Sequence, residues 1–316
     1  MADNSPPTIR KADAAAIAEA AASLLRGELV AVPTETVYGL AARADSDAAV
    51  AAIYRAKGRP DFNPLIVHVA DLVQAEHLAE LDDRARALAA QFWPGALTLV
   101  VPRRHDAALA GAVSAGLPTI ALRCPAHPVM RALIDATGLP LAAPSANRSG
   151  AVSPTSAAHV AASLGASIGL ILDGGDCAAG IESTIVALRQ DGGWQVLRPG
   201  PVTQAQILAI LGERDEVVTP SRMIEVPGQL ESHYAPGKPL RLGAVKAGPD
   251  EFHIGFGPVA GDINLSDTAD LNDAAARLYA TLHLAAASRK SRIAVAPVPD
   301  SGIGSAINDR LRRAAA

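Results

Sequence analysis

Polar side chains follow a short apolar run near the start of the chain. The run at 29–31 predicts a buried strand. The residues after it include Thr34, Glu35, Thr36 and Tyr38. Polar groups at the mouth of a buried strand cost free energy unless they are hydrogen-bonded or serve a function. They are therefore the first candidates for a binding site.

Two cations lie close together where a helix must end. Lys57 and Arg59 flank a glycine and are followed by a proline. Glycine and proline both end helices. Lysine supplies a point charge and arginine a bidentate fork, which together suit an anionic ligand. The alternative is that the two cations only complement the helix dipole. Asn63 and His68 lie near the ends of the next predicted strand.

A third cluster combines hydroxyl and amide groups. Ser145, Asn147 and Ser153 follow the strand predicted at 139–143. The proline after Ser153 predicts that this serine caps the helix expected at 155–164. Backbone N–H groups and hydroxyls at a helix N-terminus form a phosphate site, although a polar loop with a cap would give the same pattern.

A fourth cluster lies at 173–184, with Arg198 after it. It contains Glu182 and Ser183 together with glycines, which either let a ligand approach the backbone or simply make turns. Arg123, at the end of another predicted strand, adds a further cation. Hydroxyls, amides and cations at the ends of several strands, with few carboxylates, indicate an anionic substrate such as a nucleoside triphosphate.

Composition and missing motifs exclude several classes of protein. The 316 residues are 49% hydrophobic and 19% charged, with a net charge of −4, which is typical of a globular protein and argues against a surface devoted to nucleic acid. The phosphate loop GxxxxGK[ST], HExxH, paired CxxC motifs and GxSxG are absent. Two cysteines without metal or disulfide spacing, and no apolar run long enough to span a membrane, predict a soluble cytoplasmic protein.

Strand-like and helix-like segments alternate through the first two thirds of the chain, and predict one α/β domain around a large twisted sheet. Apolar runs predict strands at 29–32, 65–69, 97–101, 119–122, 139–143, 168–172, 184–188 and 194–197. Helical periodicity predicts helices at 12–25, 48–55, 83–92, 128–136, 155–164 and 204–211, the last with a capping box at Thr203 and Gln206.

The periodicity is lost between residues 213 and 238, which predicts an interdomain linker. After it, a compact βαβ-type module is expected, with helices at 271–287 and from 303 onward. We therefore expect a first domain at 1–212, with its core at about 12–205, and a second at 239–316.

Several stretches, spread over nearly all of residues 12–205, resemble the threonylcarbamoyl-AMP synthases and their YrdC-like catalytic domain. They are PTETVYGL, KGRPDFNPLIVHV, WPGALTLV, ALRCPAHP, APSANRSGAVSPT, GIESTIV and LRPG. HYAP and GIGSAINDRLRRA, nearer the C-terminus, are similar to the linker and the Rossmann-like second domain of the long form of this family. The resemblance implies a twisted mixed sheet with a concave pocket, and a linker that reaches over the active site.

The activity that the resemblance implies is nucleotidyl transfer. L-threonine, bicarbonate and ATP, with Mg²⁺ carried by ATP, would give threonylcarbamoyl-AMP, pyrophosphate and water. The product supplies the threonylcarbamoyl group of a tRNA adenosine beside the anticodon, through a tRNA threonylcarbamoyl transferase complex. We expect no membrane association, no stable nucleic-acid binding and no metal ligand among the protein side chains.

The resemblance also implies roles for individual residues. Lys57 and Arg59 are the expected catalytic residues. The threonine site would comprise Thr36, His68, Arg123, Ala143 and Ser183. The ATP site would comprise Arg59, Asn63, Thr119, Ser145, Asn147, Ser153, Arg198 and Tyr234. In the linker, the chain departs from the family pattern at Gln229, Glu231 and Ser232. We expect Tyr234 to close over ATP; the alternative is that it only docks the second domain.

Two other functions would leave different marks. An RNA-binding factor would carry a broad basic face with interleaved aromatic residues, and its RNA affinity would depend steeply on salt. An enzyme that transfers a carbamoyl group from carbamoyl phosphate through an adenylate would belong with larger maturation proteins, which carry cysteine sets of the zinc-finger kind; only two cysteines are present here.

Overall fold

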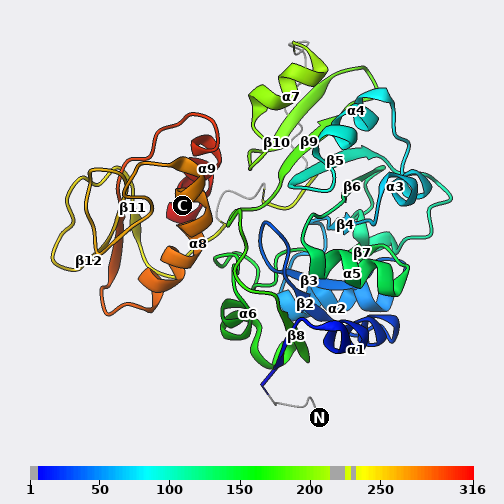
Figure 1. The fold of residues 1–316 in the computed structure, drawn as a ribbon, viewed down its shortest axis with the longest axis horizontal. Helices are drawn as coiled ribbons and strands as arrows, with labels where there is room; N and C mark the ends of the chain where they lie inside the picture. The colour runs from blue at the N-terminus through cyan, green and yellow to red at the C-terminus, as the bar shows by residue number, and fades with distance from the viewer. Residues whose placement is uncertain (1–5, 214–224, 229–232) are drawn as a thin grey trace.

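The computed structural model describes residues 6–213, 225–228 and 233–316, and two separate sheets organise this part of the chain (Figure 1). The strands of the larger sheet are β1 (Thr8–Lys11), β2 (Val30–Val32), β3 (Gly39–Arg43), β4 (Ile66–His68), β5 (Leu97–Pro102), β6 (Thr119–Arg123), β7 (Leu141–Ala142), β8 (Leu170–Asp173), β9 (Thr184–Leu188) and β10 (Trp194–Arg198). Their order is β1-β8-β2-β3-β7-β4-β6-β5-β9-β10. β4 and β6 are parallel whereas β5 and β6 are antiparallel, so the predicted mixed sheet is confirmed.

Helices pack on both faces of this sheet. They are α1 (Ala14–Leu25), α2 (Asp47–Lys57), α3 (Leu72–Leu78), α4 (Asp83–Phe92), α5 (Pro128–Thr137), α6 (Ala157–Leu164) and α7 (Gln204–Leu211), with short 3-10 helices at Gly111–Val113 and Gly165–Ser167. Successive side chains of a strand point to opposite faces. Ala31 accordingly belongs to the apolar cluster that includes residues of α2 and α4, whereas Val30 and Val32 belong to the cluster that includes residues of α1 and α5. The core therefore has two layers of small aliphatic side chains, one on each face.

The second domain has a smaller, fully parallel sheet. Its strands are β11 (Leu240–Arg241), β12 (Glu251–Gly255), β13 (Ile263–Asn264) and β14 (Arg292–Val295), in the order β11-β14-β12-β13. The helices α8 (Leu271–Ala287) and α9 (Gly304–Ala315) pack against it, on the side that faces the first domain (Figure 1). The predicted smaller α/β domain is thus confirmed, while the limits at 212 and 238 stay a prediction.

The core of the second domain continues into the first. Its apolar cluster includes Val37, Val152 and Ile181 from the first domain and Tyr234 from the linker.

Within the described residues, no helix combines the length and apolar character needed to cross a membrane.

Three elements of the first domain were missed by the sequence patterns. β1 is exposed along its whole length, so it carries no apolar run. β3 has the sequence GLAAR, and glycine and alanine have low strand propensity. α3 has seven residues, too few for a clear helical period.

The start of α6 differs from the expected position. Ser156, rather than Ser153, caps the helix by accepting a hydrogen bond from the His159 backbone N–H. Ser153 lies three residues before this cap, and its hydroxyl donates to Glu182 at 2.5 Å. The predicted capping box at Thr203 and Gln206 is present at the start of α7.

Candidate functional site

A small cavity lies where β4, β6 and β10 end, between the first domain and the described part of the linker. Its volume is about 40 Å³. The predicted site residues that line it are Thr36, Arg59, His68, Arg123, Ala143, Ser145, Ser183, Arg198 and Tyr234. The other residues that line it are Val37, Ile66, Pro144, Glu182, Pro227, Gly228 and His233. Residues drawn from six of the motifs quoted for the first domain and from the linker therefore meet in one place.

The polar stretch after β2 is held in a tight turn that faces this cavity. The Thr34 hydroxyl donates to the Val37 carbonyl at 2.6 Å, and the Thr34 and Thr36 hydroxyls lie 2.8 Å apart. Arg123, at the end of β6, donates to Thr36 at 2.9 Å and to the carboxylate of Glu35 at 2.5 Å. The polar groups at the mouth of the strand are thus paired with one another and with one cation.

The turn after β2 is also joined to the third cluster through the backbone. The Leu40 N–H donates to the Pro144 carbonyl at 2.7 Å, and the Ala146 N–H donates to the Tyr38 carbonyl at 2.8 Å. These bonds place Ser145 beside the turn, across from Arg123, and both residues line the cavity.

His68 lies in register with Arg123, on the neighbouring strand β4. Burial, followed by the charge of Arg123, lowers the pKa of His68 to about 3. The imidazole is therefore neutral near pH 7. Its Nδ1 is buried and has no hydrogen-bond partner among the described residues. This nitrogen is available to a ligand in the cavity.

Lys57 ends α2 but does not serve the helix dipole. It is buried, and its Nζ donates to the carbonyls of Ser145 and Asn147 at 2.5 Å each. Burial, and then the charge of Arg59, lowers the pKa of Lys57 well below its ordinary value. The lysine binds the third cluster to the end of α2, and it lies behind the cavity rather than in its lining.

Arg59 is held by its own neighbours in the chain. Its guanidinium donates to the side-chain oxygen of Asn63 at 2.6 Å and to the Pro64 carbonyl at 2.9 Å. Burial lowers the pKa of Arg59 to about 10, so it remains a cation near pH 7. Asn63 thus orients the arginine that lines the cavity.

Arg198 reaches the cavity from the end of β10, where the register with β9 is irregular. It donates to the carbonyl and to the hydroxyl of Ser183 at 3.1 Å each, and to the Pro227 carbonyl at 3.3 Å. The Ser183 hydroxyl lies 2.7 Å from that of Thr98. One guanidinium therefore connects β9, β10 and the linker.

Tyr234 has contacts on two sides. Its ring stacks on Tyr279 of α8 with centroids 5.5 Å apart, and the guanidinium carbon of Arg310 on α9 lies 5.5 Å from its centroid. It also lines the cavity, next to His233 and Gly228. Its φ of 64° is in the left-handed region, which a tyrosine rarely adopts. Docking to the second domain and closing the cavity are therefore compatible roles.

Several predicted residues are not part of the cavity wall. Lys57, Asn63 and Asn147 form a layer behind it, and Ser153 lies behind Glu182. Thr119 starts β6, whereas Arg123 at the other end of the strand lines the cavity. The role of Thr119 in binding ATP stays a prediction. Gln229, Glu231 and Ser232 lie outside the described residues.

Sequence reasoning gave no role to Glu182, although it stands in the fourth cluster. Its carboxylate accepts from Ser153, from Tyr279 at 2.8 Å and from Arg310 at 3.0 Å. Burial alone would raise the pKa of Glu182, but Arg310 and Arg198 lower it to about 2. It is a fixed anion whose partners come from distant parts of the sequence.

Comparisons with known proteins identify the family of the chain. Residues 22–200 match the Sua5_yciO_yrdC family, described as telomere recombination. The chain belongs to this family. Residues 202–316 match Sua5_C, described as the threonylcarbamoyl-AMP synthase C-terminal domain.

Individual relatives of the family resemble two thirds or more of the chain. The threonylcarbamoyl-AMP synthase of Bacillus subtilis is 42% identical over 322 residues, which span 95% of this chain and 92% of the relative. That of Pyrococcus abyssi is 44% identical over 224 residues, which span 69% and 64%. The crystal structure of P. abyssi Sua5 complexed with L-threonine superposes with a TM-score of 0.86 at 34% identity, and covers 98% of this chain and 96% of that one.

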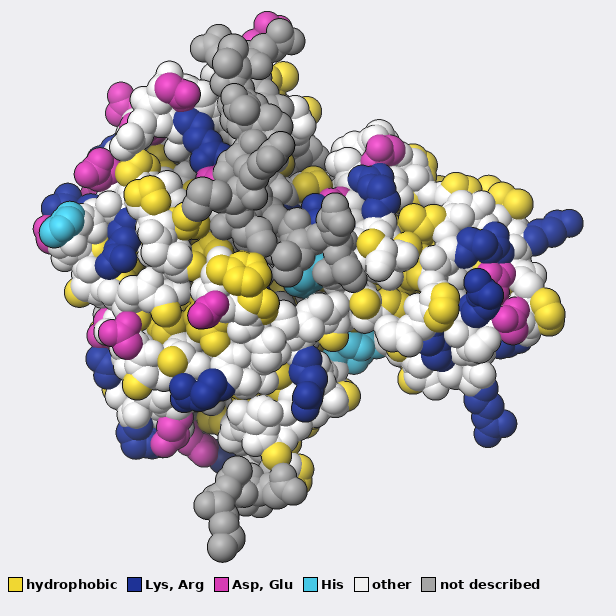
Figure 2. Space-filling model, turned by 180° about the vertical axis from the view of Figure 1, so that it is seen from behind, with side chains coloured by type: hydrophobic (Ala, Val, Ile, Leu, Met, Phe, Trp, Pro, Cys, Tyr) yellow, Lys and Arg dark blue, Asp and Glu magenta, His cyan; other side chains and the backbone are white. Residues whose placement is uncertain are grey.

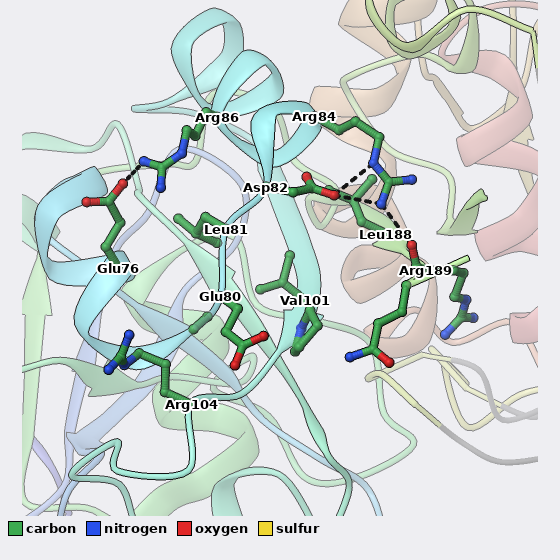
Figure 3. A pocket seen from close by; sticks show the side chains of 13 residues that line it. Glu76, Glu80, Leu81, Asp82, Arg84, Arg86, Val101, Arg104, Leu188 and Arg189 are labelled. Carbon is green, nitrogen blue, oxygen red and sulfur yellow. Dashed lines mark hydrogen bonds and ion pairs between the residues drawn. The ribbon is translucent and has the colours of Figure 1, made fainter. Parts of the chain in front are cut away.

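A separate cavity beside α4 and β5 contains none of the site residues predicted for this chain (Figure 3). Its volume is about 570 Å³. Its arginines already have carboxylate partners: Figure 3 shows Arg86 paired with Glu76, and Arg84 paired with Asp82. This cavity therefore suits an anionic substrate less well than the smaller one, in which Arg59 and Arg198 are hydrogen-bonded to oxygens of uncharged groups.

The chain offers little for a metal ion or for RNA. Among the described residues, no group of three or more His, Cys, Asp or Glu side chains could hold a metal. Lys and Arg are mixed with Asp and Glu over the described part of the face in Figure 2, without a broad basic stripe. The RNA-binding alternative thus gains no support from this face.

Proposed function

We propose that this chain joins L-threonine, bicarbonate and ATP into threonylcarbamoyl-AMP, with release of pyrophosphate and water. The observation that carries the proposal is the convergence of three buried guanidinium groups on one cavity, those of Arg59, Arg123 and Arg198. Among the described lining residues the only carboxylate is Glu182, and its charge is already paired. Such a site suits a substrate with several negative charges.

The threonine half of the site would lie around Arg123 and Thr36. The Arg123 guanidinium can bind the threonine carboxylate, because its fork suits a bidentate pair. The guanidinium would then be shared between this carboxylate and that of Glu35. Thr36, the unpaired Nδ1 of His68 and the Ser183 hydroxyl are buried polar partners for the threonine hydroxyl and amine. Ala143 supplies an apolar wall. A site built around a hydroxyl rejects valine by about 10⁴-fold in favourable cases.

The ATP half would lie around Arg59 and Arg198. Ser145 lines the cavity beside them, and Tyr234 covers it. Asn63, Asn147 and Ser153 are bonded directly to this wall or lie just behind it. The side-chain oxygen of Asn147 is buried and has no partner among the described residues. It is thus available for a donor group of the nucleotide.

The reaction needs no nucleophile from the protein. The threonine amine attacks bicarbonate to give a carbamate and water, and a carbamate oxygen then attacks the α-phosphate and displaces pyrophosphate. What the protein must supply is alignment and stabilisation of charge on the phosphates. Arg59 and Arg198 are placed to do this, and Lys57 fixes the loop that carries Ser145.

Magnesium belongs to the substrate in this proposal. The described residues do not offer a donor set for it, whereas Mg²⁺ commonly binds through the phosphates of a nucleotide. We therefore assign it to MgATP and derive no protein-bound metal step.

Entry of ATP requires the cavity to enlarge. A volume of about 40 Å³ is far below the roughly 300–1,000 Å³ of ordinary ligand pockets. Pro227, Gly228, His233 and Tyr234 form the cover, so their displacement would admit the substrate and their return would exclude water. Exclusion of water would protect the labile carbamate.

The test is pyrophosphate release by the purified protein with MgATP. Threonine and bicarbonate are supplied together, each is omitted in turn, and serine or valine replaces threonine. Release that needs both co-substrates and prefers threonine supports the proposal, as does detection of threonylcarbamoyl-AMP by mass spectrometry. Release that ignores threonine but requires carbamoyl phosphate would favour the carbamoyl-transfer alternative. Salt-sensitive RNA binding without any release would favour the RNA-binding one.

The cellular role follows from the product. Threonylcarbamoyl-AMP is an activated acyl donor, so a second enzyme must transfer the group to an adenosine beside the anticodon of a tRNA. We propose that a tRNA threonylcarbamoyl transferase complex in the cytoplasm receives it.

A further inference from the structure

Two buried side chains of the second domain hold the wall of the candidate site. Arg310 lies on α9 and Tyr279 on α8, and both are completely buried. Arg310 Nε donates to the Glu182 carboxylate at 3.0 Å, and the Tyr279 hydroxyl donates to the same oxygen, Glu182 Oε2, at 2.8 Å. The contacts cross from one domain to the other, and they end on a residue that lines the cavity.

Arg310 holds the two chain segments that carry Ser183 and Arg198 at the cavity wall. Its Nη1 donates to the Pro199 carbonyl at 2.9 Å, and Pro199 directly follows Arg198. Glu182 directly precedes Ser183. Since Arg198 is itself hydrogen-bonded to Ser183, one guanidinium fixes the two chain segments that carry this pair.

A second branch of the same contacts reaches Ser153. The other carboxylate oxygen of Glu182, Oε1, accepts from the Ser153 hydroxyl at 2.5 Å. From α8, the Nε2 ring nitrogen of His283 lies 3.1 Å from the Ser153 carbonyl. Ser153 is thus held through both its side chain and its backbone by groups that depend on the second domain.

These contacts fit positioning better than proton transfer. Glu182 stays ionised, and each of its oxygens already accepts a hydrogen bond. An anion so fully paired is a poor general base, but it keeps its neighbours in one geometry. A buried charge with its partner removed is costly, so the strands cannot hold this geometry without the second domain.

We propose that Arg310 and Tyr279 are positioning residues by which the second domain completes the nucleotide half of the site, acting through Glu182 on Arg198 and Ser153. The inference rests on the proposed function for the identity of the nucleotide. It gives the second domain a direct role in substrate affinity.

The test compares MgATP and threonine affinities in three variants and one control. Tyr279→Phe removes one hydroxyl and keeps the ring that stacks on Tyr234. Arg310→Gln removes the charge, while Arg310→Lys keeps it but cannot reach Glu182 and Pro199 with the same fork. The control, Arg277→Gln, changes an exposed arginine on α8.

We expect a roughly tenfold rise in the MgATP dissociation constant for Tyr279→Phe, from loss of a hydrogen bond to a charged group. The rise should be larger for Arg310→Gln and partly reversed in Arg310→Lys. Threonine affinity and the melting temperature of Tyr279→Phe should stay close to those of Arg277→Gln. Calorimetry with each substrate alone separates the two affinities, and turnover then reports KM for ATP and threonine separately.

The outcomes separate this inference from the proposed function. If wild-type protein makes threonylcarbamoyl-AMP but Tyr279→Phe and Arg310→Lys bind MgATP as tightly as the control, the positioning role is wrong. A fall in kcat and melting temperature at unchanged KM would also overturn it, since a merely structural role predicts that pattern. If wild-type protein binds MgATP without forming the product, the proposed function fails, and the calorimetric comparison still decides the inference.

Discussion

Arg123 donates to the Thr36 hydroxyl at 2.9 Å, and this bond ties the end of β6 to the turn that follows β2. The same guanidinium reaches Glu35 and the Gly95 carbonyl, so it is fixed before any substrate arrives. A cation held in this way loses little conformational entropy on binding a carboxylate. It is a preorganised partner for the amino-acid substrate.

The first prediction follows from that geometry. Arg123→Lys should raise the KM for threonine by about tenfold or more, because an ammonium cannot reproduce the fork that joins Glu35, Thr36 and a ligand. The KM for ATP should change little. Steady-state pyrophosphate release with each substrate varied in turn measures both values. Arg55→Lys, an exposed change on α2, is the matched control, and equal effects of the two substitutions would remove Arg123 from the threonine site.

The second prediction concerns Lys57. Lys57→Met should lower turnover by about 100-fold or more, since the carbonyls of Ser145 and Asn147 lose their common donor and the loop shifts. The free energy of unfolding should change by no more than about 2 kcal/mol, because removal of a desolvated charge offsets the lost hydrogen bonds. Chemical denaturation and turnover of the same preparation test the two parts. Wild-type turnover would exclude Lys57 from the site.

The third prediction is that acid weakens the fold. Burial lowers the pKa of His68 to about 3 and that of His159 to about 4, both below the ordinary value of 6.5. The unfolded chain therefore binds more protons than the folded one below pH 6.5, and the free energy of unfolding falls as the pH drops toward 4. The melting temperature should be lower at pH 5 than at pH 7.

A variant isolates one part of this effect. His159 stacks on His283 with ring centroids 4.0 Å apart, at the contact between α6 and α8. His159→Phe keeps a ring there but cannot be protonated, so its melting temperature should fall less between pH 7 and pH 5. Burial would raise the pKa of Glu182, but the neighbouring cations lower it from 4.5 to about 2, so its contribution to the free energy of unfolding is lost only below about pH 4.5. A wild-type melting temperature that is flat from pH 7 to pH 5 would contradict the prediction.

The fourth prediction concerns the cover of the cavity. A Cβ at Gly228 would lie 2.8 Å from the Tyr234 hydroxyl oxygen. The φ of Gly228 is 87°, which is unfavourable for residues other than glycine. Gly228→Ala should therefore displace the cover and weaken MgATP binding by several-fold. Gly192→Ala has a similar φ with open space around the added carbon, so it controls for backbone strain. Equal MgATP affinity in the two variants would argue against a covering role.

Much of the fold could be predicted from the sequence because strong local signals agree with it. The apolar runs give strands where the core is buried on both faces, and α4, α7 and α8 have the expected limits. The end of α2 at Lys57 follows from Gly58, whose φ of 58° needs a glycine. The clusters of polar residues near strand ends also contained half of the residues that line the cavity, because buried polar groups need hydrogen-bond partners or a function.

The remainder depends on contacts that no local pattern contains. Glu182 and Arg310 are 128 residues apart, and only the packing of α9 on the first domain brings them together. Ser153 looked like a helix cap because a proline follows it, yet α6 starts only at Ala157, and the Ser153 hydroxyl donates to the distant Glu182. β1 joins the sheet edge through backbone hydrogen bonds alone, which leave no side-chain signature.

The apolar cluster of the second domain, which includes Val37, Val152 and Ile181, has a consequence for how the molecule unfolds. Neither half can detach without exposing aliphatic surface to water, so the boundary behaves as interior rather than as a hinge between independent bodies. Heating should melt both halves in one cooperative transition. A chain truncated in the linker should aggregate instead of yielding a soluble catalytic fragment.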